Sequence, residues 1–189
     1  VATGSDGIFT GAKQGTVYFD LTSNLPSTVR RIAAKGLEKG IIVLDAPVSG
    51  GVPGAIHGTL SVMVGGDRLS FDKYKPILDA IGGNIFHLGE LGTGCAAKLV
   101  NNMLNIAYSQ LLHEGVVLGV KAGIDPVTLY EVVNVSSASR MIQGMRGILE
   151  RKWDDPDFTL QLASKDVSLA VQLGRDLGAV IGLEYPSAA

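Results

Sequence analysis

Cysteine is almost absent from this sequence, since Cys95 is the only one among 189 residues. A chain with one cysteine cannot form an internal disulfide, a composition typical of proteins that work in a reducing compartment. We therefore expect a cytoplasmic location, or the mitochondrial matrix if the source is eukaryotic.

Basic runs and long apolar runs are absent as well. The net charge is −2 and no stretch is rich in lysine and arginine, so we expect no nucleic-acid partner. No apolar run is long enough to span a bilayer, and the first residues carry no secretory signal pattern, so we expect no membrane association. His57, His87 and His113 fall on different elements without metal-ligand spacing, so we expect no metal and interpret all three as structural or surface residues.

Apolar residues, at 46%, and 25 glycines are abundant, which is typical of one or two globular domains with many tight turns. Before residue 92, short apolar runs alternate with helical stretches. This pattern predicts a βαβ unit and a parallel sheet. The expected strands are 17–21, 41–44, 59–64 and 84–88, and the expected helices are 26–39 and 69–80, the latter interrupted at Pro76. After Gly94 only helices are expected, at 94–122, 126–134, 138–150 and 164–181.

The longest predicted helix opens with a lysine and an asparagine on one face. Lys98 and Asn102 are four residues apart, and the polar line continues through Asn105, Ser109 and His113. Because the other sides of this helix are apolar, we expect it to be buried and Lys98 to be partly enclosed. Burial would lower the pKa of Lys98 towards neutrality, as a proton donor or acceptor requires. Taken alone, however, the segment favours a lysine that reaches solvent from the helix start.

A second stretch, Ser49-Gly50-Gly51, follows the strand predicted at 41–44. In open α/β sheets, ligands bind beyond the carboxyl ends of the strands. Backbone N–H groups of the two glycines and the Ser49 hydroxyl could hold a ligand carboxylate there. The alternative is a solvent-facing loop, and the three residues alone favour that alternative.

The two stretches belong to a longer pattern. It comprises Asp45-Ala46-Pro47-Val48-Ser49-Gly50-Gly51, Gly58-Thr59-Leu60, Gly65-Gly66, Gly94-x-x-x-Lys98-x-x-x-Asn102 and Lys165-Asp166-Val167-Ser168-Leu169-Ala170. In order and spacing, this pattern resembles the β-hydroxyacid dehydrogenase family, and within it the 3-hydroxyisobutyrate dehydrogenases and related semialdehyde reductases.

The resemblance implies a metal-free oxidoreductase that uses NAD or NADP to interconvert a small 3-hydroxy acid and its semialdehyde. It implies an α/β fold with part of a doubly wound parallel sheet, followed by an all-α domain that a long helix connects. Residues 1–92 would be the C-terminal part of a dinucleotide-binding (Rossmann) domain, and 93–189 a helical substrate and dimerisation domain of the 6-phosphogluconate dehydrogenase type.

The resemblance also assigns roles to residues. Lys98 would be the catalytic acid and base, and Asn102 would orient the substrate. The substrate is a small carboxylic acid, whose carboxylate Ser49, Gly50 and Gly51 would hold. The residues expected to contact the cofactor are Ser23, Phe158, Lys165 and Asp166.

Other functions remain open. A reductase of tartronate, glyoxylate or succinic semialdehyde would carry the same motifs. The family's Gly-x-Gly-x-x-Gly phosphate loop is missing from this chain, which begins at Val1 without a methionine. We therefore expect a piece of a longer protein, which leaves open whether this piece is active alone or is a non-catalytic dimerisation and lid segment.

The long helix also predicts self-association. Its apolar surface exceeds what one small domain covers, and Gly115, Gly119 and Gly123 recur every fourth residue, which would let another helix approach closely. We expect a homodimer or homotetramer, whereas simple tolerance of glycine is the alternative explanation.

Overall fold

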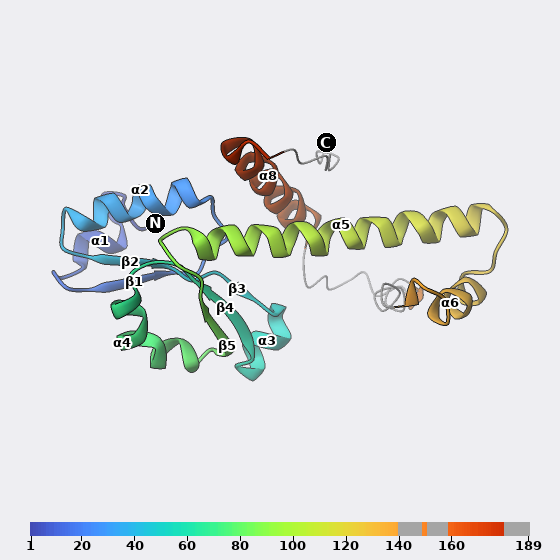
Figure 1. The fold of residues 1–189 in the computed structure, drawn as a ribbon, viewed down its shortest axis with the longest axis horizontal. Helices are drawn as coiled ribbons and strands as arrows, with labels where there is room; N and C mark the ends of the chain where they lie inside the picture. Colours follow the sequence, from blue (N-terminus) through green and yellow to red (C-terminus); the bar gives the residue numbers. More distant parts are fainter. Residues whose placement is uncertain (140–148, 151–158, 180–189) are drawn as a thin grey trace.

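The computed structural model describes residues 1–139, 149–150 and 159–179. An α/β part lies at one end, and one long helix extends from it to a small helix at the far end (Figure 1). The elements, in chain order, are α1 (Ile8–Gly11), β1 (Val17–Asp20), α2 (Pro26–Leu37), β2 (Ile42–Asp45), β3 (Val48–Ser49), α3 (Gly51–His57), β4 (Leu60–Val64), α4 (Arg68–Asp79), β5 (Gly82–His87), α5 (Thr93–Lys121), α6 (Pro126–Asn134) and α8 (Leu160–Leu177).

The strands of the described residues form two small sheets, β1-β2 and β3-β4-β5. β1 and β2 pair in parallel around α2, which confirms the predicted βαβ unit, and β4 and β5 are also parallel. β3, by contrast, pairs antiparallel with β4, and an antiparallel bridge from Asp45 to Gly65 links the two sheets. The parallel pairing that was predicted holds for β1 with β2 and for β4 with β5, whereas β3, which was not predicted, makes the second sheet mixed. The connection from Ser49 to Leu60 is shorter than the dozen or so residues that a parallel crossover needs.

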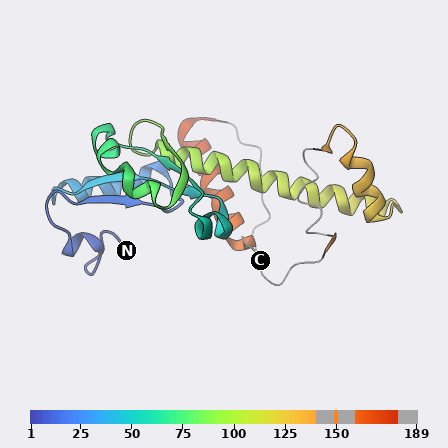
Figure 2. The same ribbon diagram turned by 90° about the horizontal axis from the view of Figure 1, so that it is seen from below.

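Helices cover both faces of this α/β part, with α2 and the start of α5 on one side and α4 on the other (Figures 1 and 2). Successive strand residues point to opposite faces, so Val43 packs with Val29 and Cys95, whereas Leu44 packs with Phe71 in a second cluster. The start of α5 is therefore part of the α/β core.

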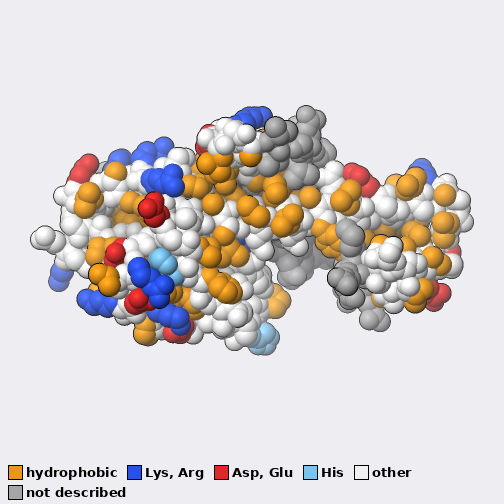
Figure 3. All heavy atoms as spheres, in the orientation of Figure 1, with side chains coloured by type: hydrophobic (Ala, Val, Ile, Leu, Met, Phe, Trp, Pro, Cys, Tyr) orange, Lys and Arg blue, Asp and Glu red, His pale blue; other side chains and the backbone are white. Residues whose placement is uncertain are grey.

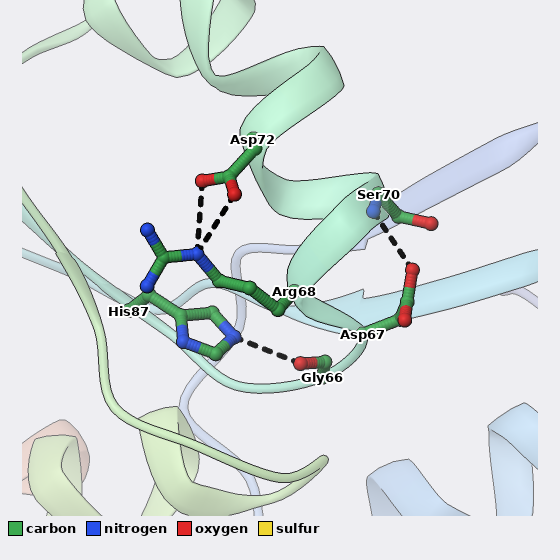
Figure 4. Close-up of polar contacts among 6 residues, drawn as sticks. All are labelled: Gly66, Asp67, Arg68, Ser70, Asp72 and His87. Atoms are coloured by element: carbon green, nitrogen blue, oxygen red, sulfur yellow. Dashed lines mark hydrogen bonds and ion pairs between the residues drawn. The ribbon is translucent and has the colours of Figure 1, made fainter.

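Helix α4 runs through Pro76 without the predicted interruption. Proline removes one helical hydrogen bond, to the carbonyl of Asp72, but both residues are exposed and water can bind that carbonyl. The helix begins at an Asp67 carboxylate that accepts the Ser70 N–H at 2.7 Å (Figure 4).

Helix α3 was not predicted, because glycines at 51 and 54 and Pro53 disfavour a helix locally. Helix α8 begins at 160 rather than 164, since the Thr159 hydroxyl accepts the Leu162 N–H and starts it earlier. The predicted helix 138–150 lies mostly outside the described residues, as does Phe158.

Only the first half of α5 is buried as expected. Near its middle it packs on α8, where Ile106 contacts Ala163 and Val167. Beyond that contact apolar side chains are exposed, with Leu118 at 72%. The space-filling view shows hydrophobic side chains along this helix and over α6 (Figure 3). Among the described helices, none combines the length and apolarity that a bilayer crossing requires.

The glycine row on α5 does not form the continuous track that its spacing predicted. A Cβ on Gly119 would lie 2.5 Å from Leu129 Cδ2, so this glycine serves a contact with α6 in the same chain. Gly123 follows the helix end with a φ of 90°. Gly115 and Gly123 are open, with nothing within 4 Å of an added Cβ, and only Gly115 of these two lies within the helix.

Candidate active site

Lys98 and Asn102 lie one turn apart on the buried half of α5. Their exposed fractions are 9% and 7%, which confirms the predicted enclosure and excludes a lysine that reaches freely into solvent. Burial lowers the pKa of Lys98 below its ordinary value, because the charged form loses hydration. The negative charge of Asp166 acts in the opposite direction, and the positive charge of Lys165 adds to the lowering.

Ser49-Gly50-Gly51 forms the turn from β3 into α3. Ser49 pairs with Ser61 of β4. Gly50 and Gly51 have φ values of 135° and 62°, which residues with a side chain rarely adopt. The glycines therefore provide the turn geometry that the alternative interpretation required, and this geometry alone does not identify a ligand.

The two segments line one cavity of about 660 Å³. Its wall from the turn and α3 faces its wall from α5. The lining residues are Val48, Ser49, Gly50, Gly51, Val52, Ala55, Leu60, Lys98, Asn101, Asn102, Asn105 and Ile106. The cavity thus combines an apolar wall with a few convergent polar groups, as small-molecule sites do.

Asn101 joins the two walls and was missed from the sequence. Its Nδ2 donates to Ser49 Oγ at 3.3 Å and to Asn102 Oδ1 at 3.1 Å. Asn105 also lines the cavity. Asn101 is three residues from Lys98 and so shares its helix face, a signal that was available in the sequence.

Asp166 brings α8 to the same network. This residue is 2% exposed, and its Oδ2 accepts a hydrogen bond from Asn102 Nδ2 at 2.5 Å. Lys165 is half-exposed, with Nζ 3.0 Å from Asp166 Oδ1. Ser23, in the loop after β1, is half-buried and does not line the cavity.

The histidines lie apart from the cavity. His87 is part-buried, and its Nε2 lies 2.8 Å from the Gly66 carbonyl oxygen (Figure 4). Its ring also contacts that of Phe71. His57 and His113 are exposed. Within 1–139, 149–150 and 159–179, no group of three or more His, Cys, Asp or Glu side chains is arranged to hold a metal ion.

Two family models match the chain. One, described as the NAD binding domain of 6-phosphogluconate dehydrogenase, matches residues 1–89. The other, described as NAD-binding of NADP-dependent 3-hydroxyisobutyrate dehydrogenase, matches residues 92–184. The interval between the two matches falls just before α5.

Similar proteins carry related names. 2-(Hydroxymethyl)glutarate dehydrogenase of Eubacterium barkeri is 39% identical over 93% of this chain and 59% of its own length. 3-Hydroxyisobutyrate dehydrogenase of Pseudomonas aeruginosa is 37% identical over 94% and 64%. A solved structure of Mycobacterium tuberculosis 3-hydroxyisobutyrate dehydrogenase with L-serine has a TM-score of 0.79 at 29% identity, covering 92% of this chain and 62% of that one.

This chain therefore spans about three fifths of the length of these proteins. The matches run through both the α/β part and the helical part, and they include the motif segments that line the cavity. On this evidence, the chain belongs to the β-hydroxyacid dehydrogenase family.

Proposed function

We propose that the protein containing this chain is an NAD(P)-dependent dehydrogenase that interconverts a small 3-hydroxy acid and its semialdehyde. The observation that carries the proposal is the cavity in which buried Lys98 and Asn102 face Ser49, Gly50 and Gly51. One cavity would thus hold a proton-transfer group and a set of hydrogen-bond donors for a carboxylate. A substrate that carries both a carboxylate and a reacting hydroxyl requires both.

On the carboxylate side, Ser49 is prepared to donate. Because Asn101 Nδ2 donates to Ser49 Oγ, the oxygen already accepts one hydrogen bond and the hydroxyl proton is free for a ligand. Backbone N–H groups of Gly50 and Gly51 would add donors to the same carboxylate. This arrangement would fix the acid end of the substrate.

On the reacting side, Lys98 would take the hydroxyl proton during oxidation and return it to the carbonyl oxygen during reduction. Its lowered pKa brings the neutral form closer to physiological pH, which makes acceptance of that proton easier. Asn102 would hold the same substrate oxygen through Oδ1 or Nδ2, while Asp166 fixes the orientation of its amide.

The residues of this chain fit part of a dinucleotide. Ser23 follows the carboxyl end of β1, where such ligands lie in parallel sheets, and half-exposed Lys165 could reach a phosphate or ribose. Asp166, with its buried carboxylate, would contribute through Asn102. A bound nicotinamide supplies the hydride chemistry. Phe158 remains a predicted contact outside the described residues, and the choice between NAD and NADP stays open.

The proposed substrate class follows from the compounds named for three similar proteins. 2-(Hydroxymethyl)glutarate, 3-hydroxyisobutyrate and L-serine each carry a primary hydroxyl on the carbon next to the one that bears the carboxylate. We propose a substrate of that pattern for this protein. Reductases of tartronate, glyoxylate or succinic semialdehyde would use the same proton-transfer residue in the opposite direction.

We further propose that 1–92 and 93–189 are two domains, with the start of α5 packed into the core of the first, and that the helical one mediates a homodimer or homotetramer. The support is the exposed apolar surface of the distal half of α5 and of α6, including Leu111, Leu118 and Val132. A second copy of the chain would bury it.

The single buried cysteine suits the reducing cytoplasm or mitochondrial matrix.

Replacement of Lys98 by Ala in the full-length protein tests the main proposal. We expect kcat for a 3-hydroxy acid to fall by about 10²–10⁴-fold with little change in cofactor affinity. Lys121→Ala, at the other end of the same helix, is the control and should keep full activity. Near-normal turnover of the Lys98 variant would remove this lysine from the mechanism.

A further inference from the structure

Asp45 is a completely buried carboxylate that the proton-transfer scheme does not use. It ends β2, and its exposed fraction is 0%. Its Oδ1 accepts the Gly92 N–H and its Oδ2 accepts the Cys95 N–H, both at 2.7 Å. A buried carboxylate satisfied in this way is costly to disturb, because each N–H would lose a charged partner.

The two N–H groups lie at the start of a helix, where backbone N–H groups have no partner in the helical ladder and are often bound by nearby side chains. Gly92 is the N-cap residue of α5 and Cys95 is its third residue. In a capping box, side chains at these two positions bind each other's N–H groups. Gly92 has no side chain, and a carboxylate 47 positions earlier in the chain, that of Asp45, accepts both N–H groups instead.

The backbone of Asp45 is itself held by a pair of hydrogen bonds to Gly65. Its backbone N–H donates to the Gly65 carbonyl at 3.1 Å, and the Gly65 N–H donates back to the Asp45 carbonyl at 2.8 Å. The α5 backbone lies directly on the neighbouring strand, since a Cβ on Gly94 would be 2.1 Å from the Met63 carbonyl oxygen. The carboxylate therefore holds α5 against a backbone that has little freedom to move.

Asp45 also lies on the segment that carries the opposite wall of the cavity. Ser49 follows it by four residues, and Lys98 follows Cys95 by three, about 4.5 Å along the helix axis. One short path thus runs from Ser49 through the Asp45 carboxylate to Lys98. A shift at the capped end of α5 would move Lys98 relative to the hydrogen-bond donors of the Ser49-Gly50-Gly51 turn.

We propose that Asp45 is a positioning residue that sets the distance between Lys98 and the Ser49-Gly50-Gly51 turn by capping α5 from β2. The inference rests on the proposed function, because it assigns a catalytic purpose to this contact. It predicts that weakening the cap slows the proton-transfer step far more than it weakens cofactor binding.

The test is Asp45→Asn in the full-length protein. Asn keeps the shape, but its Nδ2 carries hydrogens and cannot accept the N–H that faces it. We expect kcat to fall by about 10- to 100-fold, the loss typical of a small misplacement, with the KM of the cofactor little changed. The matched control is Asp67→Asn, the same exchange at the N-cap of α4, where the carboxylate accepts one N–H, that of Ser70, at 2.7 Å (Figure 4). Asn can still cap there through its Oδ1, and the residues of α4 do not line the cavity.

Cys95 supplies a second readout that needs neither substrate nor cofactor. Burial first, and then the Asp45 charge, raise the pKa of its thiol to about 12. In Asp45→Asn, the reaction of Cys95 with dithiodipyridine under native conditions should accelerate by about 10- to 100-fold, because the helix start opens more often and the thiolate forms more easily. Asp67→Asn should leave this rate unchanged.

The outcomes separate the two proposals. Slow turnover and fast Cys95 labelling in Asp45→Asn alone would support the positioning role. Unchanged kcat in Asp45→Asn, or an equal kcat loss in both variants, would overturn it. Should Lys98→Ala remain active, the proposed function fails, and accelerated Cys95 labelling would then report a structural cap without a catalytic purpose.

Discussion

Gly94 offers the sharpest test of how α5 is seated. Replacing it with Ala adds one methyl group, which would lie 2.1 Å from the Met63 carbonyl oxygen and 2.9 Å from Asp45 Oδ2. Real Cβ atoms do not approach other atoms this closely, so a backbone has to move by about an ångström. Neither neighbour is a flexible side-chain end that could turn away.

The expected size follows from two opposing effects. Overpacking in a close-packed core costs about 1–3 kcal/mol, and we expect the upper end because strand backbone is involved. Ala in place of Gly within a helix returns about 1 kcal/mol. The net loss in the free energy of unfolding should therefore be about 2 kcal/mol, or a Tm lower by about 4–8 °C for a chain of this size.

Gly115→Ala on the same helix is the matched control. An added Cβ there meets nothing within 4 Å, so only the helix-propensity gain of about 1 kcal/mol should appear. Urea unfolding followed by circular dichroism measures both variants, with unchanged m-values required for the comparison. If both substitutions stabilise the protein, or both leave it unaltered, α5 is not seated on β4 as described.

Three further predictions concern activity and assembly. The pKa of Lys98 is lowered, and reduction needs the protonated form of this lysine. The rate of reduction should therefore decline as the pH rises through that lowered pKa, while the rate of oxidation should increase. Profiles of kcat against pH in both directions check this, and parallel profiles would contradict it. An amide or ester of the substrate should be a poor substrate, and equal kcat/KM for acid and ester would count against the carboxylate role. Gly50→Ala should raise the KM of the acid, because Gly50 has a φ of 135° and an added Cβ would crowd Leu60 Cδ2 at 3.1 Å. Leu118→Glu should convert an oligomer to a monomer in sedimentation at micromolar concentration, whereas Leu37→Glu, equally exposed on α2, should not; a monomeric parent protein would refute self-association.

Local pattern was sufficient for most elements and for the central pair of the candidate site. Apolar runs bounded by glycine and proline located β1, β2 and β4 to within one or two residues. The four-residue spacing put Lys98 and Asn102 on one helix face, and the structure brings both into one cavity with the Ser49 turn. These are properties of short segments, and helix and strand periodicities are enough to infer them.

Tertiary contacts account for what was missed. The antiparallel pairing of β3 depends on where α3 returns the chain, and α3 itself exists despite unfavourable local propensities. From the sequence, Gly119 could have served a contact with another chain, whereas in the structure α6 of the same chain packs against it. The capping of α5 by Asp45 joins residues 47 positions apart, a relation that no local period reveals.

That long separation has a consequence for the order in which the protein folds. Gly92 has no side chain that could cap the start of α5, so the first turn of this helix has its charged partner only where β2 lies beside it. Contacts between distant residues form late, since the intervening loop must be closed first. During synthesis the sheet residues leave the ribosome before α5, so the strand carboxylate is in place to receive it. A chain in which β2 is misplaced would therefore leave the start of α5 without its cap and would not hold Lys98 at the cavity.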